Sequence, residues 1–558
     1  MNTFQLAQIS GWIFYLVLFC WLFYFIKRTM YFAYLWQLKE YRWDRMRDFI
    51  GTYLGRKSFI NLSGAVTLAF LLLIFFLADF AWAWLTLVIG AAGWYLTQLI
   101  FLLKDLGQRK LKSPKFTSKA MVLTAGVFIF EIAVILWWYL ALQTLRATVP
   151  FIIEDLFFIM AMELLAPLWV ALITILLWPV TNYLKNRILK QARAKLSRLN
   201  TTVIGITGSY GKTSTKEFLA AILGAKFKVL KTPEHVNTEL GVANIILTEL
   251  TPEHEIFIVE MGAYRTGEIK TLCRLTNPKI GVLTGINEQH LSLFGSLDNI
   301  ITAKSELISS LPVNGLAVVN GDSPAAQQAA AKRATGGRVE FYSLNEKGAI
   351  KAHDIIIELR TIKFTVETKR GSFKVTAPLL GKQQASNLLA AITVAEDLGM
   401  SPEEISQALV YIKPLSRAMS PKEGPKQTLL IDDTYNANPN GVKAGLEYLA
   451  ATPFKTKILV LDDLNELGHQ ALAIHEELAK LAARSAQVFV LVGYDYAENF
   501  KQSLMNNGAD KERIIVTRQL TLINDIIKEY LNAETVILFS GRGAGKVLNN
   551  LISTGAED

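Results

Sequence analysis

The residues from Gly208 to Thr213, GSYGKT, have the composition of a loop that binds phosphate. They lie between a β-rich run at Thr202–Thr207 and a helical run at Lys212–Leu223. In such a loop the glycines let backbone N–H groups turn toward phosphate oxygens at the N-terminus of the helix. Lys212 would reach the outer phosphates of a nucleotide, and the hydroxyl of Thr213 would hold Mg²⁺.

The prediction of a nucleotide site depends on placement as well as on composition. Ile206 stands where the first glycine of the GxxxxGK[ST] pattern would be, but the loop still joins a strand to a helix. A glycine-rich turn without a ligand is the alternative. The residues expected to contact the nucleotide are Gly208, Ser209, Tyr210, Gly211, Lys212, Thr213 and Ser214.

Three side chains with catalytic potential follow the phosphate loop. Glu260 ends a strand-like run, Ile256–Glu260, and His290 comes after a second run at Ile280–Thr284. Lys304 lies in the helical stretch beyond it. Because parallel sheets bind ligands at the carboxyl ends of their strands, Glu260 is expected beside the phosphate loop. Alone, His290 would more often be a structural histidine and Lys304 a solvated helix residue. Because both residues follow a phosphate loop and Glu260 in the chain, they are candidates for catalysis.

Motifs along residues 200–550 resemble those of the Mur ligase family, in the order expected for it. Besides the phosphate loop they are EMGA (260–263), NEQHLSLFGSL (287–297), AKSEL (303–307), GKQQASNLLAA (381–391), the region of Arg417, DDTYNANP (432–439) and DLNELG (463–468). The last two, together with NTELG at 237–241, resemble the MurF branch, whose members add D-alanyl-D-alanine to a muramoyl tripeptide.

This resemblance implies an ATP-dependent ligase with ATP and Mg²⁺ as cofactors. In the family, a substrate carboxylate attacks the γ-phosphate of ATP and gives an acyl phosphate and ADP. An amine then displaces phosphate and forms an amide. Because a carboxylate must approach a polyanion, the main requirement is positive charge, which Mg²⁺ and Lys212 would supply.

The same resemblance implies roles for single residues. Thr213 and Glu260 would hold one Mg²⁺, and His290 would help to hold a second. Lys304 would carry a carbamate, formed from its amine and CO₂, as a further metal ligand. The other implied contacts with ATP are Asn387 at the adenine, Asp433 at the ribose and Arg417 at the γ-phosphate.

The soluble part is predicted to contain two α/β domains. They are a central P-loop ATPase domain at 200–415 and a Rossmann-like C-terminal domain at 416–558, with a hinge at Pro414–Ser416. In the second domain, candidate strands alternate with helical runs such as Gly441–Leu449 and Ala471–Ala483. The candidate strands are Leu429–Ile431, Ile458–Leu461, Val488–Val492 and Val536–Phe539.

In the Mur ligase family this C-terminal domain brings the amine substrate and closes over ATP. Substrate contacts are therefore expected at Tyr435, Asn436 and Asn438, and also at Asn237 and Thr238 of the NTELG element in the central domain. Turn geometry is the alternative for the residues of the YNANP element, because Asn and Pro favour turns.

Residues 1–199 are predicted to form an α-helical membrane domain. The 558-residue chain is long enough for about three domains, and its first part is the most apolar. The runs that approach the roughly 20 residues needed to cross a bilayer are Ile9–Ile26, Ile60–Ala78, Phe80–Leu103, about Ala120–Leu142 and about Leu156–Trp178. Only Asp79 separates the second run from the third, which predicts a helical hairpin. The N-terminus has neither the basic stretch nor the cleavage site of a signal peptide.

The net charge of +10 belongs to this membrane part. Residues 1–200 hold 21 Lys and Arg against 9 Asp and Glu, whereas residues 201–558 hold 37 against 39. This placement argues against nucleic acid as a partner. The basic residues gather at 27–58, 104–119 and 185–198, while the connection at 143–155 has only Arg146. By the positive-inside rule, the N-terminus is expected outside the cell membrane and the α/β domains in the cytoplasm.

Within the membrane part, segment 27–58 mixes aromatic with basic residues and is predicted to include a helix in the headgroup region. A cytoplasmic extension of the first helix is the alternative. Glu131 and Glu163 lie inside apolar runs and are expected to face a neighbouring helix or a lipid headgroup rather than to serve transport. Cys20 and Cys273 lie far apart, which excludes a disulfide framework and fits a reducing compartment.

The chain departs from the MurF pattern in three places. Gln383 and Gln384 stand where the family commonly has His-Asn, and of the family's Lys-Gly-Ser-Arg element only Arg542 is matched. Membrane helices also occupy the place of the family's UDP-binding domain. The partners expected are therefore a peptide carboxylate that is linked either to UDP or to a lipid, an amino acid or dipeptide such as D-Ala-D-Ala, and the bilayer.

Two other functions remain open at this point. One is a membrane-bound Mur-like ligase for another envelope polymer, such as poly-γ-glutamate. The other is a non-ligase ATP-gated membrane protein, which the lack of internal repeats and of paired intramembrane charges disfavours. The sequence does not define the oligomeric state.

Overall fold

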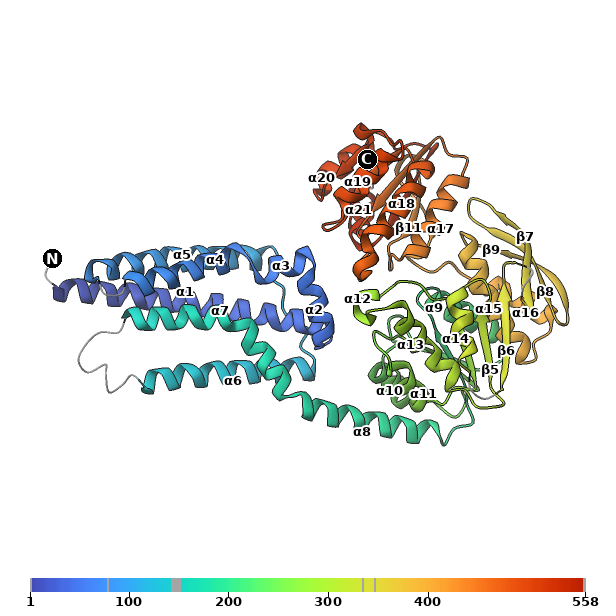
Figure 1. Cartoon of the computed structure of the whole chain (residues 1–558), viewed down its shortest axis with the longest axis horizontal. Helices are drawn as coiled ribbons and strands as arrows, with labels where there is room; N and C mark the ends of the chain where they lie inside the picture. The colour runs from blue at the N-terminus through green and yellow to red at the C-terminus, as the bar shows by residue number, and fades with distance from the viewer. Residues whose placement is uncertain (1–2, 78–79, 142–151, 334–335, 346–347, 555–558) are drawn as a thin grey trace. The chain divides into compact units, whose positions relative to one another are not determined.

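The computed structural model describes residues 3–77, 80–141, 152–333, 336–345 and 348–554. Asp79, on which the predicted helical hairpin depends, and Arg146, which was used to predict the membrane orientation, lie outside these residues. The chain divides into two compact units, Met1–Lys185 and Asn186–Asp558. Figure 1 colours both along the chain.

The first unit is helical. Its elements are α1 (Thr3–Leu38), α2 (Trp43–Gly51), α3 (Tyr53–Phe59), α4 (Leu62–Leu77), α5 (Ala81–Gly107), α6 (Ser118–Ala141), α7 (Ile152–Leu176) and the first half of α8 (Trp178–Leu196). The segments that are long and apolar enough to cross a membrane are Gly11–Leu38, Tyr53–Leu77, Ala83–Gly107, Ser118–Ala141 and Ile152–Leu176. They correspond to the five predicted runs, with ends shifted by a few residues and the first run extended. In Figure 1, α1 runs alongside α5 and α7, and all three contribute to one apolar core.

The two acidic residues of the apolar runs face neighbouring helices, as predicted. Glu163 of α7 is fully buried and accepts hydrogen bonds from Thr67 Oγ1 at 3.0 Å and Tyr95 Oη at 2.7 Å. Glu131 of α6 accepts from Thr29 Oγ1 of α1 at 3.1 Å. In an apolar surrounding such bonds tie helices together, because an unsatisfied carboxyl is costly there.

Over its first third, segment 27–58 forms an extension of the first helix, which was the alternative to a separate helix in the headgroup region. Residues up to Leu38 continue α1 instead of forming a separate surface helix. The remainder forms the short helices α2 and α3, and Met46 of α2 packs with Phe32 and Trp36 of α1. The apolar periodicity of α1 continues past Lys27 and Arg28, and this explains why the helix does not end where the charges begin.

The second unit begins with the central α/β domain, whose sheet has nine strands. Their order is β2 (Val229–Lys231), β3 (Ile256–Glu260), β1 (Thr202–Thr207), β4 (Ile280–Leu283), β5 (Leu316–Asn320), β6 (Arg338–Ser343), β7 (Ile350–Ile357), β8 (Ile362–Thr368) and β9 (Gly371–Ala377). The strands from β2 to β7 are parallel, and β8 and β9 add an antiparallel edge.

The central strands β3, β1, β4 and β5 of this sheet are buried on both faces, and successive side chains point to opposite sides. In β3, Ile256 and Ile258 enter the core under one set of helices, while Phe257 and Val259 enter the core under the other. The helices of the first face are α9 (Lys212–Leu223), α15 (Lys382–Asp397) and α16 (Pro402–Ala408). The helices of the second are α10 (Glu239–Thr248), α11 (Glu268–Thr276), α13 (Leu297–Ser309), α14 (Pro324–Ala331) and the end of α8.

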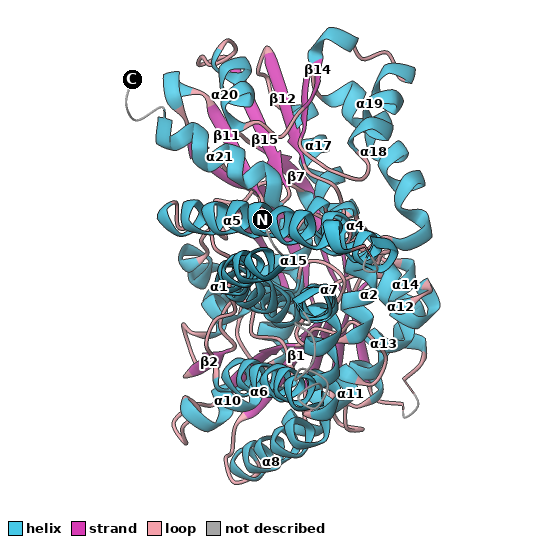
Figure 2. Cartoon of the chain, turned by 90° about the vertical axis from the view of Figure 1, so that its left-hand side faces the viewer, coloured by secondary structure: helices cyan, strands magenta, loops and turns pink. Residues whose placement is uncertain are grey.

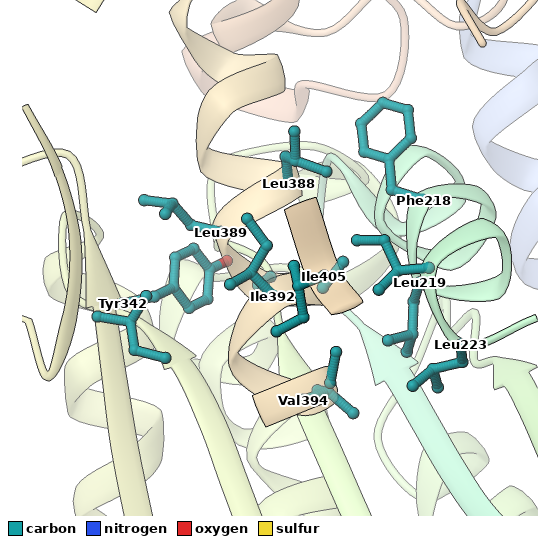
Figure 3. Packing of buried hydrophobic residues seen from close by; sticks show 14 of the residues in the cluster. Phe218, Leu219, Leu223, Tyr342, Leu388, Leu389, Ile392, Val394 and Ile405 are labelled. Carbon is teal, nitrogen blue, oxygen red and sulfur yellow. The ribbon is translucent and has the colours of Figure 1, made fainter. Parts of the chain in front are cut away.

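Figure 3 looks into the first of these cores. Phe218 and Leu219 of α9 lie near Leu388 and Ile392 of α15, and Tyr342 comes from β6. The packing fixes α9 against the sheet. Since α9 begins directly after the phosphate loop, this core also holds the loop in place.

The C-terminal domain is a second sheet covered on both sides. Its strand order is β10 (Ser420–Glu423), β11 (Leu429–Asp433), β15 (Thr535–Ser540), β12 (Thr456–Leu461), β13 (Val488–Leu491) and β14 (Ile514–Val516), all parallel except β10. Figure 2 shows α20 (Leu520–Lys528) and α21 (Arg542–Thr554) on one side of this sheet and α17 (Pro439–Ala451), α18 (Ala471–Ser485) and α19 (Ala497–Asn506) on the other. The predicted strands and helices of this domain are confirmed.

Candidate active site

The phosphate loop joins β1 to α9, as the sequence predicts. Gly208 has φ of 153° and Gly211 has φ of 76°, which L-residues rarely adopt. A Cβ atom on Gly211 would collide with the side-chain amide of Asn387. Both glycines are therefore required, and Asn387 of α15 lies directly against the loop.

Lys212 and Ser209 keep the loop in one conformation. Lys212 Nζ donates to Gly208 O at 2.8 Å and to Ser209 O at 3.2 Å, so its charge lies over the loop. Desolvation lowers the pKa of Lys212, opposed by the negative charge of Glu260. The Ser209 hydroxyl accepts from Asn287 N at 3.2 Å and joins the loop to the segment after β4.

Glu260 forms the polar centre beside this loop. It ends β3, in register with Ile206 of β1, and is 3% exposed. Its Oε2 accepts from Thr213 Oγ1 at 3.0 Å, and its Oε1 accepts from Asn237 Nδ2 at 3.3 Å. Lys216 Nζ of α9 lies 3.4 Å from Oε2. The predicted pairing of Glu260 with Thr213 is present in the structure.

This group suits a magnesium ion. Carboxylate and hydroxyl oxygens are the ligands that Mg²⁺ prefers, and it keeps several waters rather than a full protein cage. Glu260 and Thr213 would hold the ion.

His290 lies at the start of a short helix, α12 (Leu291–Phe294), with φ of 67°. Its Nδ1 contacts Glu466 of the C-terminal domain, and its ring meets Tyr264 edge-on, with 4.8 Å between centroids. Desolvation lowers the pKa of His290, opposed by Glu466, and the charges of Lys304 and Lys212 lower it further. The imidazole is thus fixed by a carboxylate and lies within electrostatic reach of both lysines.

Lys304 is 2% exposed on α13. Desolvation, together with the charge of Lys212, lowers its pKa to about 7. A carboxylate partner for its ammonium within 4 Å is not found among the described residues. Carbamate formation requires a neutral amine, and an ordinary lysine with a pKa near 10.4 is about 0.04% neutral at pH 7. Burial thus lowers the pKa of Lys304 to about 7, although the charges of Glu268 and Glu306 oppose this shift.

Asp433 and Arg417 lie at the start of the C-terminal domain. Asp433 ends β11, and its Oδ1 accepts from Met419 N at 3.2 Å. Desolvation, reinforced by Asp432, raises the pKa of Asp433 to about 7. The Arg417 side chain donates to the hydroxyl and to the carbonyl oxygen of Thr434, each at 3.1 Å.

Several contacts join the C-terminal domain to the central domain. Besides His290 with Glu466, Asn287 Nδ2 donates to Asn440 Oδ1 at 2.7 Å. The ring of Tyr435 stacks on His235, with 5.1 Å between centroids, and its hydroxyl lies 3.1 Å from His235 Nδ1. Tyr435 thus reaches the central domain.

The remaining predicted residues differ in their surroundings. Asn438 Oδ1 accepts from Gly441 N at 3.0 Å and caps α17, which is the turn-geometry alternative, whereas Asn436 is exposed. Thr238 is the N-cap residue of α10 without a side-chain capping bond. Ser214 is buried in the first turn of α9, and desolvation raises the pKa of Tyr210.

Sequence reasoning missed three residues of this site. Lys216 is fully buried and lies near Glu260, Glu466 holds His290, and His235 stacks on Tyr435. One signal was available for Lys216: it lies four residues after Lys212, on the same face of α9. No local signal predicts the other two, because each makes its contact with a residue more than 170 positions away.

Comparison with known proteins agrees with this geometry. Residues 206–395 match the Mur ligase middle domain, and residues 419–543 match the Mur ligase glutamate ligase domain. The chain is 36% identical over 290 residues to the UDP-N-acetylmuramoyl-tripeptide--D-alanyl-D-alanine ligase of Mycobacterium tuberculosis, which covers 51% of this chain and 56% of that protein. It is 32% identical over 324 residues to the ligase of the same name from Escherichia coli, covering 57% and 71%. The chain thus spans little more than half the length of the mycobacterial relative.

Solved structures give the same relationship. MurF from Acinetobacter baumannii matches with a TM-score of 0.60 and 27% identity, covering 66% of this chain and 80% of that one. MurF from Thermotoga maritima, in complex with ADP, matches with a TM-score of 0.60 and 27% identity, covering 67% and 84%. From these matches and from the shared phosphate loop, Glu260 and the second α/β domain, we conclude that the chain belongs to the Mur ligase family.

Proposed function

We propose that this protein is a membrane-anchored ATP-dependent ligase of the MurF type, acting in the synthesis of peptidoglycan precursors. It would activate a peptide carboxylate with ATP and join it to an amine such as D-Ala-D-Ala. The observation that carries the proposal is the arrangement of Lys212, Lys304 and His290 around the phosphate loop beside Glu260. Positive charge from Lys212, and from a Mg²⁺ held by Glu260 and Thr213, would suit the approach of a carboxylate to the γ-phosphate.

The chain's own residues would perform three tasks in this reaction. The backbone N–H groups of the loop and the Lys212 ammonium bind the phosphates of ATP and reduce their repulsion of the incoming carboxylate. Glu260 and Thr213 hold Mg²⁺, which when bound supplies further positive charge at the phosphates. Asn237 and Lys216 orient the Glu260 carboxylate, because each contacts one of its oxygens.

Lys304 and His290 would complete the site on the acceptor side. We propose that Lys304 carries a carbamate, whose oxygens join His290 as ligands of a second Mg²⁺. Support comes from burial of the amine and from its low pKa. A permanent ammonium beside Lys212 would be repelled, whereas a carbamate would be attracted.

The C-terminal domain would close the nucleotide site and present the amine. Asn387 already lies against the phosphate loop, and we assign it, Asp433 and Arg417 to ATP. The substrate side would include Asn237, Thr238, Tyr435, Asn436 and Asn438. The contact of Tyr435 with His235 supports this placement, because it brings the YNANP element to the central domain.

The membrane part would anchor the enzyme with its N-terminus outside and both α/β domains in the cytoplasm. The five apolar helices and the basic loops between them support this orientation. The acceptor would be the UDP-linked muramoyl tripeptide used by the named relatives, or the same peptide on a lipid carrier.

The test is the dependence of ADP release on both substrates. Purified full-length protein is incubated with ATP, Mg²⁺, a peptide acceptor and D-Ala-D-Ala, with each component omitted in turn. The ligase predicts ADP release only when acceptor and amine are both present, with one ADP for each amide. ATP hydrolysis that needs neither would support a non-ligase ATPase instead.

A further inference from the structure

The helical unit contains a cavity of about 340 Å³ that the ligase reaction does not use. It lies among α1, the end of α3, Asn61 before α4, α5 and the segment that follows α5. Its size falls in the roughly 300–1,000 Å³ range of small-molecule sites. Tyr24, Arg28 and Gln98 form its inner wall and are each less than 9% exposed, whereas Lys27, Lys110 and Lys112 are at its more exposed rim.

The inner wall holds a cation with an unused hydrogen-bond donor. Arg28 is 6% exposed, and its Nε has no hydrogen-bond partner. Its ion pair with Glu163 is long, at 3.8 Å between Nη1 and Oε1, while the same Oε1 of Glu163 already accepts from Thr67. A planar guanidinium with a free donor is suited to phosphate oxygens, because it can donate two parallel hydrogen bonds to them.

The rim adds further positive charge. Lys27 is paired with Asp105 at 2.7 Å, but Lys110 and Lys112 have no carboxylate within 4 Å in the part of the chain that the structure describes. The cavity therefore has four cationic side chains, opposed at its lining by Asp105 alone and behind Arg28 by Glu163. This excess of positive charge favours the binding of an anion.

The position of the cavity indicates where this anion comes from. Its lining extends from Tyr24 and Gln98, inside the apolar segments Gly11–Leu38 and Ala83–Gly107, to the beginning of the basic segments 27–58 and 104–119. In the membrane orientation proposed above, these basic segments face the cytoplasmic headgroups, and basic pockets between membrane helices bind lipid headgroups. Aromatic side chains of Tyr31 and Phe32 complete a lining that is part polar and part apolar.

We propose that this cavity binds the phosphate group of an anionic membrane lipid, with Arg28 inside and Lys110 and Lys112 at the rim as its ligands. The proposal is independent of the ligase assignment, because none of these residues belongs to the nucleotide site. It also gives the helical unit a task beyond anchoring, namely the recognition of a lipid phosphate.

The test measures lipid retention by the full-length protein. The protein is placed in phosphatidylcholine nanodiscs with a small fraction of phosphatidic acid, and bound lipid is counted by native mass spectrometry after release into detergent. The wild type should retain about one phosphatidic acid in preference to phosphatidylcholine. The exposed double variant Lys110→Gln/Lys112→Gln should retain at least fivefold less.

A matched control removes the same charge from the same segment outside the cavity. Lys104, in the last turn of α5, and Arg109 belong to the same basic segment but do not line the cavity, so the control variant is Lys104→Gln/Arg109→Gln. It should retain phosphatidic acid like the wild type. Equal losses of phosphatidic acid retention in the two double variants would overturn the proposal, since they would show that the lipid is attracted by the overall charge of the segment and not by the cavity.

A second arm separates a lipid from a soluble phosphate. Inorganic pyrophosphate is added at the concentration of phosphatidic acid. Retention of the lipid should not change, because apolar surface around the cavity contributes to lipid binding. Displacement of the lipid by pyrophosphate at this concentration would instead identify a site for soluble phosphates and contradict the lipid assignment.

Discussion

Two threonines of α9, Thr213 and Thr215, separate the chemistry of the site from the packing that supports it. Thr213 Oγ1 donates to Glu260, whereas Thr215 is fully buried and its hydroxyl has no partner among the described atoms. The substitution Thr213→Val should lower kcat for ATP turnover by about 100-fold, the loss expected when one preorganised polar group at the reacting phosphates is removed. Steady-state ADP release at saturating Mg²⁺ measures it.

The substitution Thr215→Val is the matched control. It replaces the same hydroxyl with a methyl group two residues further along α9, where the hydroxyl makes no hydrogen bond to any described residue. Its kcat should stay within about threefold of the wild type, since a buried hydroxyl without a partner contributes little. Equal losses in both variants would assign the effect to packing of α9 instead of to the Glu260 contact.

Asp433 predicts a pH dependence of nucleotide binding. Its pKa of about 7 means that the carboxyl is largely protonated at pH 6 and largely ionised at pH 8. An ionised carboxylate accepts stronger hydrogen bonds from ribose hydroxyls. The affinity for ADP should therefore rise from pH 6 to pH 8 by up to about tenfold, since a group titrates tenfold for each pH unit below its pKa. Isothermal titration calorimetry measures it.

The variant Asp433→Asn controls for titration of the nucleotide itself. Its affinity should change with pH only as far as the phosphates of ADP titrate. A wild-type profile that coincides with that of the variant would show that Asp433 does not act at the ribose.

At the scale of elements, α18 holds a buried histidine whose ring is fixed by backbone groups. His475 is 2% exposed, accepts from Leu464 N at 3.2 Å through Nε2, contacts Ala471 O at 2.6 Å through Nδ1, and stacks on Tyr496. Both ring nitrogens are satisfied by the backbone. Desolvation lowers its pKa below the ordinary value of 6.5, so the folded state favours the neutral ring.

This burial predicts acid sensitivity of the C-terminal domain. Because the unfolded chain binds the proton more readily, the contribution of His475 to stability is complete above pH 6.5 and is lost as the pH falls below that value. The Tm should drop between pH 6.5 and 5 in the wild type and less so in His475→Gln. Differential scanning fluorimetry measures both. Parallel profiles would contradict this role of His475.

Secondary structure was predictable where a strong pattern coincided with one element. The apolar strand runs of β1, β3 and β12 and the five long helices follow directly from their composition. The edge formed by β7 to β9 was not foreseen. Its strands are half exposed, and the register of β7 shifts between His353 and Ile356, so neither a continuous apolar run nor a regular alternation marks it.

The site was predictable in its parts but not in its assembly. Glu260 ends β3, His290 precedes α12 and Lys304 lies in α13. These places in the chain order of the central domain made a position near the phosphate loop predictable. Glu466 comes to His290 from a different domain, and only the packing of the two domains defines that contact. Sequence spacing carries no information about it.

On the scale of the whole molecule, the chain combines a Mur-type ATP-binding part with a helical unit. The predicted orientation places segment 104–119 on the cytoplasmic side. A cysteine at Ser113 or at Lys115 should therefore react with a membrane-impermeant maleimide only after cells are opened. Labelling in intact cells would contradict the predicted topology, because segment 104–119 and the ATP site would then lie outside the cytoplasm, where ATP is scarce.

The central claim is that this chain joins D-Ala-D-Ala to a peptide carboxylate at the expense of ATP. The most direct measurement is mass spectrometry of the product formed by the full-length protein from ATP and a muramoyl tripeptide, with D-Ala-D-Ala or glutamate as the amine. The account predicts a product heavier by one D-Ala-D-Ala residue pair, formed together with one ADP. A product with glutamate alone, or ADP without any condensed product, would contradict it.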